Sequence, residues 1–224
     1  MSNKKITIVI NEKIDNTSYL NFLQKNFEVI VIPANKIRGG EKIDLVLFTG
    51  GEDVYPGYYD QNIGSHTKYN EKRDSYERCL FDNFPNTPKL GICRGSQLLT
   101  VLNGGSLVQH VEGHSNGQLH DIQLNTIYDH NIYSITSTHH QMMYPFDMED
   151  SKYQIVGHSK YHLSDKYLNG RDENIELPSN FVEPEIVYYP ETKSLCIQGH
   201  PEMTNCPENT QHMIFNLINY YLKL

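Results

Sequence analysis

Apolar positions in the first fifty residues fall into short, nearly continuous runs separated by polar segments. Residues 6–10, 28–32 and 44–49 form such runs, which are typical of buried strands. Residues 18–27, between the first two runs, place five apolar side chains at helical spacing. Apolar strands that alternate with helices predict a mostly parallel sheet with helices on both faces, and its reactive loops should lie beyond the carboxyl ends of the strands.

The remainder of the chain continues this alternation less regularly. Further helices are expected at residues 71–84, 94–103 and 207–222, and further strands at about 88–93, 153–158, 185–189 and 194–198. Residues 106–150 alternate short β-like runs with turn residues, which predicts a small antiparallel portion. Residues 159–182 are polar and contain the breakers Asn169-Gly170 and Pro178, so we expect a long surface excursion there.

Composition and charge narrow the class of protein. The 224 residues carry a net charge of −8 and 38% hydrophobic residues, which fits one α/β domain over residues 1–224. The negative charge argues against nucleic acid or an anionic membrane as the main partner. The four cysteines show no close pairing, and the first apolar run is far too short for a signal peptide or a membrane span, so we expect a cytoplasmic protein.

The stretch at residues 91–95, Gly-Ile-Cys-Arg-Gly, has the spacing of a nucleophile elbow. In such a turn the nucleophile stands at the carboxyl edge of a sheet and at the amino end of a helix. The partial positive charge at that helix end favours a thiolate over a thiol. Taken alone, the stretch fits a buried structural cysteine equally well.

A cysteine nucleophile also needs a base, a group that orients the base, and donors for the oxyanion. His200 follows an apolar strand whose end should meet the same sheet edge as Cys93, and Glu202 stands two residues later. The oxyanion donors would be the backbone N–H groups of Arg94 and Gly51. From these residues alone, a surface turn at 199–202 and a simple turn at 50–51 remain alternatives.

His110, His114 and His120 raise the question of a metal site. Their spacing fits no standard ligand pattern, and the glycines and asparagine between them indicate loops. We therefore expect no metal ligands in this chain.

Several separated motifs together carry a resemblance to a known family. They are Thr-Gly-Gly-Glu-Asp-Val-Tyr-Pro at residues 49–56, Arg-Asp-Ser-Tyr-Glu at 73–77, Gly-Ile-Cys-Arg-Gly-Ser-Gln at 91–97, Ser-Thr-His-His-Gln at 137–141 and Gly-His-Pro-Glu at 199–202. Their joint occurrence in this order resembles the class I glutamine amidotransferase superfamily. The pattern is most similar to the gamma-glutamyl hydrolase branch, which includes gamma-glutamyl-GABA hydrolase.

The resemblance implies a flavodoxin-like class I glutamine amidotransferase fold and a role for each matching residue. It makes Cys93 the nucleophile, His200 the general base and then acid, and Glu202 the group that orients His200. Gly51 and Arg94 would form the oxyanion hole. The residues matching those that hold the glutamyl group are Gln97, Ser137, His139, His140 and Gln141. No metal or organic cofactor is implied.

The sequence departs from the family pattern beside the scissile bond. The branch usually has tryptophan or phenylalanine before His-Pro-Glu, whereas this chain has Gly199, so we expect a more open wall there. Residues 159–182 match nothing in the family with certainty.

These observations favour a stand-alone cysteine hydrolase that cleaves the amide of a small gamma-glutamyl amine or glutamine through a glutamyl thioester. One alternative is a glutaminase subunit that supplies ammonia to a separate synthase partner. Another is a non-catalytic binding or regulatory member of the superfamily. A homodimer also stays open.

Overall fold

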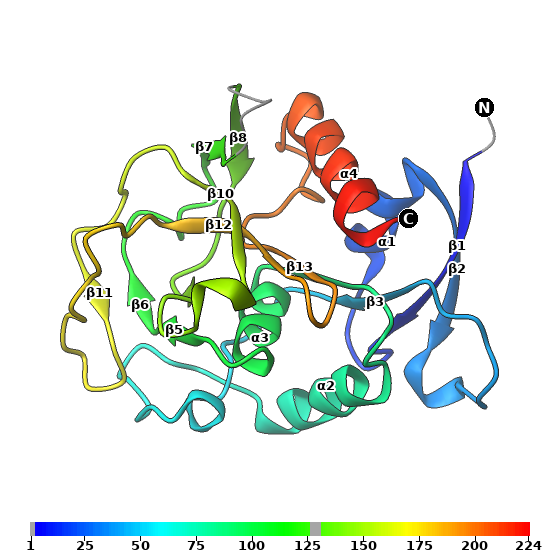
Figure 1. Cartoon of the computed structure of the whole chain (residues 1–224), viewed down its shortest axis with the longest axis horizontal. Helices are drawn as coiled ribbons and strands as arrows, with labels where there is room; N and C mark the ends of the chain where they lie inside the picture. Colours follow the sequence, from blue (N-terminus) through cyan, green and yellow to red (C-terminus); the bar gives the residue numbers. More distant parts are fainter. Residues whose placement is uncertain (1–2, 126–130) are drawn as a thin grey trace.

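A nine-stranded sheet runs through the protein in the computed structural model, which describes residues 3–125 and 131–224 (Figure 1). Its strands, in spatial order, are β2 (Phe27–Pro33), β1 (Lys4–Ile10), β3 (Leu45–Phe48), β4 (Lys89–Ile92), β13 (Ser194–Ile197), β12 (Pro184–Tyr189), β10 (Gln154–Ser159), β7 (Leu119–Leu124) and β8 (Ile132–Thr136). Residues 126–130 of the predicted β-rich segment 106–150 lie outside the described residues.

The five strands from β2 to β13 are parallel, and this part of the sheet positions the candidate site. Leu45 pairs with Ile8, and Leu90 pairs with both Leu47 and Leu195, so the carboxyl ends of β3, β4 and β13 meet at one edge. The antiparallel strands β12, β10, β7 and β8 extend the same sheet. The predicted parallel sheet and its antiparallel portion are therefore both present.

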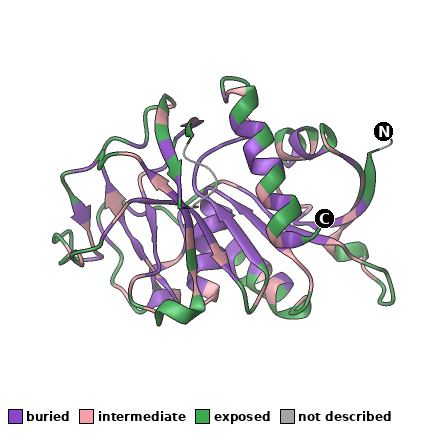
Figure 2. Cartoon of the chain, turned by 45° about the horizontal axis from the view of Figure 1, so that its top comes forward, coloured by how far each residue is buried: buried purple, intermediate pink, exposed green. Residues whose placement is uncertain are grey.

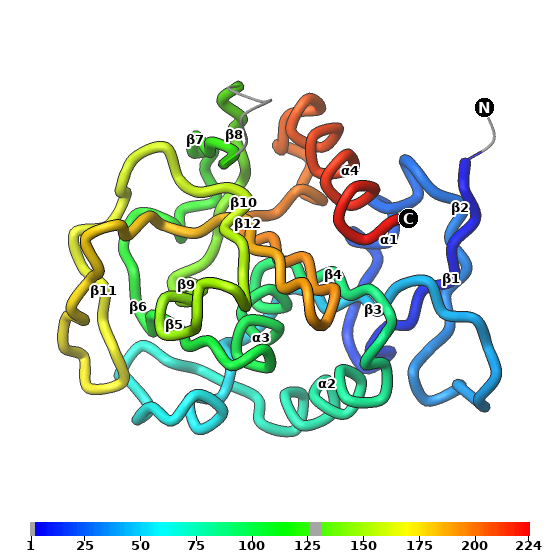
Figure 3. The backbone as a smooth tube through the Cα atoms, in the orientation of Figure 1, coloured from blue at the N-terminus to red at the C-terminus, as the bar shows by residue number. Residues whose placement is uncertain are grey.

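Helices cover the sheet on both faces, as Figures 1 and 3 show. The helices α1 (Thr17–Gln24) and α4 (Glu208–Leu222) lie on one face, and α2 (Glu71–Asn83) and α3 (Arg94–Leu102) lie on the other. Successive side chains of a strand point to opposite faces of the sheet. Leu47 packs in the apolar cluster that contains α1 and α4, and Phe48 packs in the cluster that contains α2 and α3. Figure 2 shows the resulting burial along the central strands.

Residues 159–182 are more than the surface excursion expected from their polar composition. The strand β11 (Tyr167–Leu168) pairs with β6 (His110–Val111). Tyr167 and Phe181 are buried in a third apolar cluster beside the small sheet of β5 (Ser106–Val108) and β9 (Met142–Tyr144). These two aromatic residues and the β11–β6 pairing anchor the segment, although its average composition is polar.

Short 3-10 turns complete the elements, namely η1 (Ala34–Lys36), η2 (Pro56–Tyr59) and η3 (Asp150–Lys152). No helix within residues 3–125 and 131–224 is long and apolar enough to cross a membrane.

Candidate active site

Cys93 occupies the sharp turn between β4 and α3. Its backbone has a positive φ of 53° with a ψ of −115°, a conformation that residues other than glycine rarely adopt. The two neighbouring glycines are required by close packing, because a Cβ on Gly91 would lie 2.6 Å from the carbonyl oxygen of Gly95, and one on Gly95 would lie 2.2 Å from that of Phe48. The strand-to-helix turn predicted from the glycine spacing is therefore present, and it holds Cys93 at the amino end of α3.

His200 lies between a carboxylate and a hydroxyl. Its Nδ1 is 2.7 Å from Oε1 of Glu202, and its Nε2 is 2.8 Å from Oγ1 of Thr138. Burial disfavours the charged ring, but the interactions with Cys93 and Glu202 outweigh it and raise the pKa of His200 to about 10. The arrangement thus favours an imidazolium beside the Cys93 sulfur.

The loop after β3 brings Gly50 and Gly51 against this pair. A Cβ on Gly50 would lie 3.4 Å from the His200 ring and 3.7 Å from the Cβ of Cys93. Gly51 has φ of +147°, and a Cβ there would lie 1.9 Å from Nη1 of Arg73, so only glycine fits. Arg94 begins α3, where backbone N–H groups have no acceptor within the helix. The two predicted oxyanion donors therefore flank the Cys93 turn.

A buried ionic network fixes the Gly50 loop to the Cys93 turn. The guanidinium of Arg94 pairs with Asp74 and Glu77, and Arg73 donates to Glu77 at 3.0 Å and to the Gly50 carbonyl at 2.8 Å. Burial alone would raise the pKa of Glu77, but Arg94 and Arg73 hold it below its usual range. The side chain of Arg94 is therefore structural, and its backbone N–H is the part available for chemistry.

A cavity of about 260 Å³ opens beside Cys93. It is lined by Gly51, Glu52, Asp53, Lys68, Cys93, Gln97, Thr138, His139, His140 and Gln141. Four of the five predicted substrate-binding residues are among these. A larger hollow of about 790 Å³ between α1 and α4 is lined by Glu202 but not by Cys93 or His200, so the smaller cavity is the better candidate for the reacting group.

Ser137 is the predicted substrate-binding residue that does not line the cavity. Its hydroxyl donates to the carbonyl of His114 at 2.6 Å and holds the loop from behind. Within the loop, His140 contacts Asp53 at 3.0 Å, and Gln97 donates to the carbonyl of Gln141 at 2.8 Å. Ser137 therefore supports the 137–141 loop from behind, whereas His139, His140 and Gln141 line the cavity.

The family comparison agrees with this geometry. The family model described as Peptidase C26 matches residues 28–162, which is more than half of the chain. The chain belongs to the Peptidase C26 family. Its match covers the Gly50 loop, the Cys93 turn and the 137–141 loop.

Relatives of this Peptidase C26 protein carry glutamine amidotransferase names. The glutamine amidotransferase-like protein YvdE of Lactococcus lactis is 27% identical over 213 residues, which cover 84% of this chain and 80% of YvdE. The similarly named RP404 of Rickettsia prowazekii is 39% identical over 75 residues, which cover 32% of this chain and only 27% of that relative.

Solved structures show the same fold at low sequence identity. A protein from Thermoplasma acidophilum described as one of the subunits of GMP synthase has a TM-score of 0.64 at 14% identity, with 97% of this chain and 94% of that one covered. A glutamine amidotransferase from Thermotoga maritima has a TM-score of 0.55 at 17% identity, with 100% and 85% covered. The predicted flavodoxin-like fold of the class I glutamine amidotransferases is confirmed. The Peptidase C26 family and the glutamine amidotransferase-like relatives support a cysteine-dependent amide hydrolase activity in general terms.

The wall beside His200 differs from the sequence-based expectation for this Peptidase C26 chain. A Cβ on Gly199 would lie 2.7 Å from Cγ1 of Ile135. The Ile135 side chain, which comes from β8, therefore fills the space that a larger residue at position 199 would take. The expectation of a more open wall at Gly199 was wrong. The sequence alone does not show that Ile135, which is distant in the chain, occupies the space beside this glycine.

Two contacts in the site were missed by the sequence analysis. Thr138 lies inside the 137–141 motif, so the sequence could have indicated that it lies near the site. Nothing in the motif indicates that its hydroxyl contacts His200. Tyr19 accepts a hydrogen bond from the N–H of Gly50 at 3.1 Å. Because Tyr19 belongs to the apolar helical pattern of residues 18–27, the sequence predicted only that its side chain packs in the core.

The three histidines considered for a metal site separate in the structure. His110 stacks on His66, with ring centroids 3.9 Å apart. His114 and His120 instead meet Glu185, and these three are the residues within 3–125 and 131–224 whose arrangement could hold a metal ion.

Proposed function

We propose that this protein hydrolyses the amide bond of a small gamma-glutamyl amine, or of glutamine, with Cys93 as nucleophile, His200 as base and acid, and Glu202 as the orienting carboxylate. The observation that carries the proposal is the placement of His200. Its Nδ1 is bound to Glu202 at 2.7 Å. Its Nε2, which contacts the Thr138 hydroxyl at 2.8 Å, is the nitrogen that would exchange a proton with Cys93 on the turn at the start of α3.

The first half of the reaction would form a thioester and release the amine. The Cys93 thiolate attacks the δ-carbonyl carbon of the gamma-glutamyl group, and the oxyanion accepts hydrogen bonds from the N–H groups of Gly51 and Arg94. The imidazolium of His200 then transfers its Nε2 proton to the leaving nitrogen as the carbon–nitrogen bond breaks. Glu202 keeps Nε2 aimed at the reacting atoms throughout.

The second half would restore the enzyme. Neutral His200 takes a proton from water, and the resulting hydroxide attacks the thioester carbonyl in the same oxyanion hole. The Cys93 thiolate leaves, glutamate is released, and His200 is again an imidazolium beside a thiolate.

The charges around the cavity support a substrate with an amino-acid end. Lys68 lines the cavity as a cation, and Glu52 and Asp53 line it as carboxylates that pair with Arg73 and His140. A gamma-glutamyl group carries one carboxylate and one ammonium on its α-carbon, which matches this pairing of signs. The cavity volume of about 260 Å³ suits a small group of this kind.

The test is glutamate release from glutamine and a panel of gamma-glutamyl amines. Cys93→Ala is the blank, and Cys206→Ala is the matched control, because Cys206 is also buried but lies outside this cavity. We expect turnover of at least one substrate by the wild type and by Cys206→Ala, and none by Cys93→Ala. Turnover that survives Cys93→Ala would contradict the proposal.

A glutaminase subunit remains the second candidate, because the Thermoplasma acidophilum structure is described as belonging to a GMP synthase. Under that alternative, glutamine cleavage would be weak for the isolated chain and would rise on addition of a separate synthase. Efficient turnover of an amine conjugate by the isolated chain would exclude the subunit role. A non-catalytic member would release no glutamate in either assay.

A further inference from the structure

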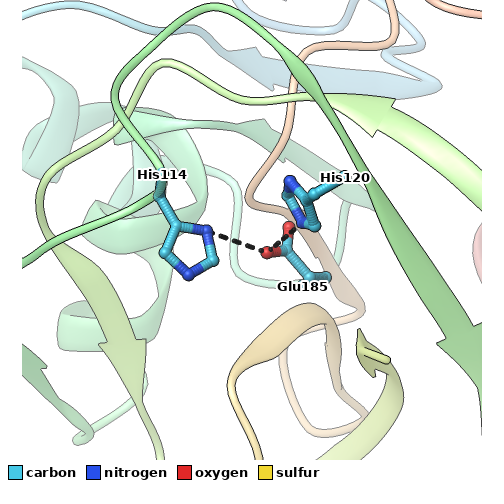
Figure 4. Close-up of side chains that lie close together, drawn as sticks. All are labelled: His114, His120 and Glu185. Carbon is cyan, nitrogen blue, oxygen red and sulfur yellow. Dashed lines mark hydrogen bonds and ion pairs between the residues drawn. The ribbon is translucent and has the colours of Figure 1, made fainter. Parts of the chain in front are cut away.

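His114, His120 and Glu185 bring two imidazoles and a carboxylate together from separate segments (Figure 4). His114 lies in the loop before β7, His120 lies on β7, and Glu185 lies on β12. Each can offer one donor atom such that all three atoms lie within 4.8 Å of one another. Oε1 of Glu185 is 2.8 Å from Nε2 of His120 and 3.6 Å from Nδ1 of His114.

Glu183 determines which nitrogen of His114 carries a hydrogen. Its carboxylate accepts hydrogen bonds from the backbone N–H groups of Leu163 and Ser164 and from the hydroxyl of Tyr167. Nε2 of His114 lies 3.2 Å from the same carboxylate, which can only accept. Nε2 therefore carries the hydrogen, and in the neutral ring Nδ1 presents a lone pair towards Glu185.

With His114 as the neutral ring, this arrangement leaves acceptors facing each other in a buried place. The side chains of His114 and Glu185 are 0% and 1% exposed. Nδ1 of His114 and Oε2 of Glu185 have no hydrogen-bond partner. Buried acceptors without donors are costly, and a cation between them would satisfy both.

We propose that this cluster is a zinc site in which Nδ1 of His114, Nε2 of His120 and the carboxylate of Glu185 bind Zn²⁺. Two imidazole nitrogens and one carboxylate oxygen are a zinc donor set, with a fourth position for water. Zinc–nitrogen distances of about 2.0–2.1 Å place tetrahedral donors roughly 3.3 Å apart, and the two separations from Glu185, 2.8 and 3.6 Å, lie on either side of that value. The two imidazole nitrogens lie within 4.8 Å of each other, so zinc would draw the histidines together. Binding replaces the hydrogen on Nε2 of His120 with the metal: in the neutral ring this hydrogen moves to Nδ1, and from the protonated ring it is released to solvent. No electron transfer is involved.

Glu183 would then act as the outer partner of the site. A histidine that binds a metal commonly donates its other N–H to a carboxylate, which fixes the ring and raises its basicity. Glu183 holds His114 in this way and is itself fixed by the 163–167 segment. The cluster therefore has both ligands and a support for one of them.

The site would brace the loop that lines the active-site cavity, although it does not depend on the proposed reaction. Ser137 donates to the carbonyl of His114 at 2.6 Å and accepts at its own carbonyl from the N–H of Gly117 at 2.9 Å. The ring of His139 lies beside that of His114, with centroids 4.7 Å apart. A metal on His114 would therefore stiffen the 137–141 loop from behind.

The experiment uses the full chain with Cys93→Ser, so that zinc cannot bind the catalytic thiol. The protein is stripped with a chelator, and zinc is titrated and counted by mass spectrometry of the element. We expect one zinc per chain, bound more tightly than about 1 μM. Cobalt(II) in the same protein should give the visible bands of a tetrahedral nitrogen and oxygen site. Absence of both stoichiometric zinc and these bands overturns the proposal without any further substitution.

Ligand variants in this background locate the site. His120→Gln should weaken zinc binding at least about 100-fold, and Glu183→Gln about 10–100-fold, because the latter removes only an outer partner. His212→Gln is the matched control, since His212 is exposed on α4 and should bind zinc as the parent does. Unchanged affinity in His120→Gln, in a protein that circular dichroism shows to be folded, would contradict the assignment.

Discussion

The hydroxyl of Thr138 lies 2.8 Å from Nε2 of His200, the nitrogen left free when Nδ1 binds Glu202. His200 is thus held at both nitrogens before any substrate binds. In the proposed reaction the same Nε2 serves Cys93 and the leaving amine, so Thr138 would steady the ring at its working end.

Replacing Thr138 by valine should slow turnover while the fold is kept. Loss of a hydrogen bond to a charged ring costs about 1.5–3 kcal/mol, which corresponds to roughly a 10-fold or larger fall in kcat/KM. Thr138→Ser restores the hydroxyl and should stay near the wild-type rate. Equal rates for the valine and serine variants would show that the contact does not contribute to turnover.

Glu202→Gln should reduce kcat by at least about 100-fold, because the imidazolium loses its charged partner. The pKa of His200 should also fall, since Glu202 is one of the groups that raise it. The basic limb of the pH profile would then move to lower pH. If rate and profile were both unchanged, another group would have to orient His200.

The pH dependence of kcat/KM should have a basic limb near 10. The pKa of His200 is raised from 6.5 to about 10, so the protonated ring is favoured in the folded protein. The associated stability is complete below pH 6.5 and is lost as pH rises through 10. Above that value no imidazolium remains to protonate the leaving amine. Measurement of kcat/KM from pH 6 to 11 tests this, and a fall already complete by neutral pH would disagree with it.

Glu77→Gln should destabilise the protein by about 3–5 kcal/mol, because it breaks a buried ionic network and leaves Arg73 and Arg94 without one of their partners. Urea unfolding measures the change. Asp82→Asn on the same helix removes an exposed ion pair with Arg78 and should cost less than about 1 kcal/mol. Similar losses for the two variants would argue against a special role for the buried network.

The parallel strands and the Cys93 turn could be predicted from the sequence, because apolar runs and glycine spacing determine them locally. The convergence of Gly51 and His200 could also be predicted, because the carboxyl ends of parallel strands meet at one edge of a sheet. The sequence could not place Ile135, which fills the space beside Gly199 from a strand far along the chain. The sequence also did not indicate that His114 and His120 lie beside Glu185, because the strand pairing that brings them together cannot be read from residue spacing. Side-chain contacts that depend on which distant strands pair with one another thus needed the structure.

Gly199→Ala tests the packing against Ile135. The added Cβ would lie 2.7 Å from Cγ1 of Ile135, and such overpacking costs about 1–3 kcal/mol. Ile135→Ala leaves a cavity and should cost about 2–5 kcal/mol by itself. The double variant should lose at least about 0.5 kcal/mol less than the sum of the two, because each change relieves the other. Strict additivity in urea unfolding would mean that the two residues do not compete for this space.

The most direct test of the central claim is mass spectrometry of the protein quenched during turnover of a gamma-glutamyl amide. The account predicts a glutamyl adduct on the peptide that contains Cys93. The adduct should be absent in Cys93→Ala. Glutamate release with no adduct on Cys93 at any time point, or an adduct on another residue, would contradict the account.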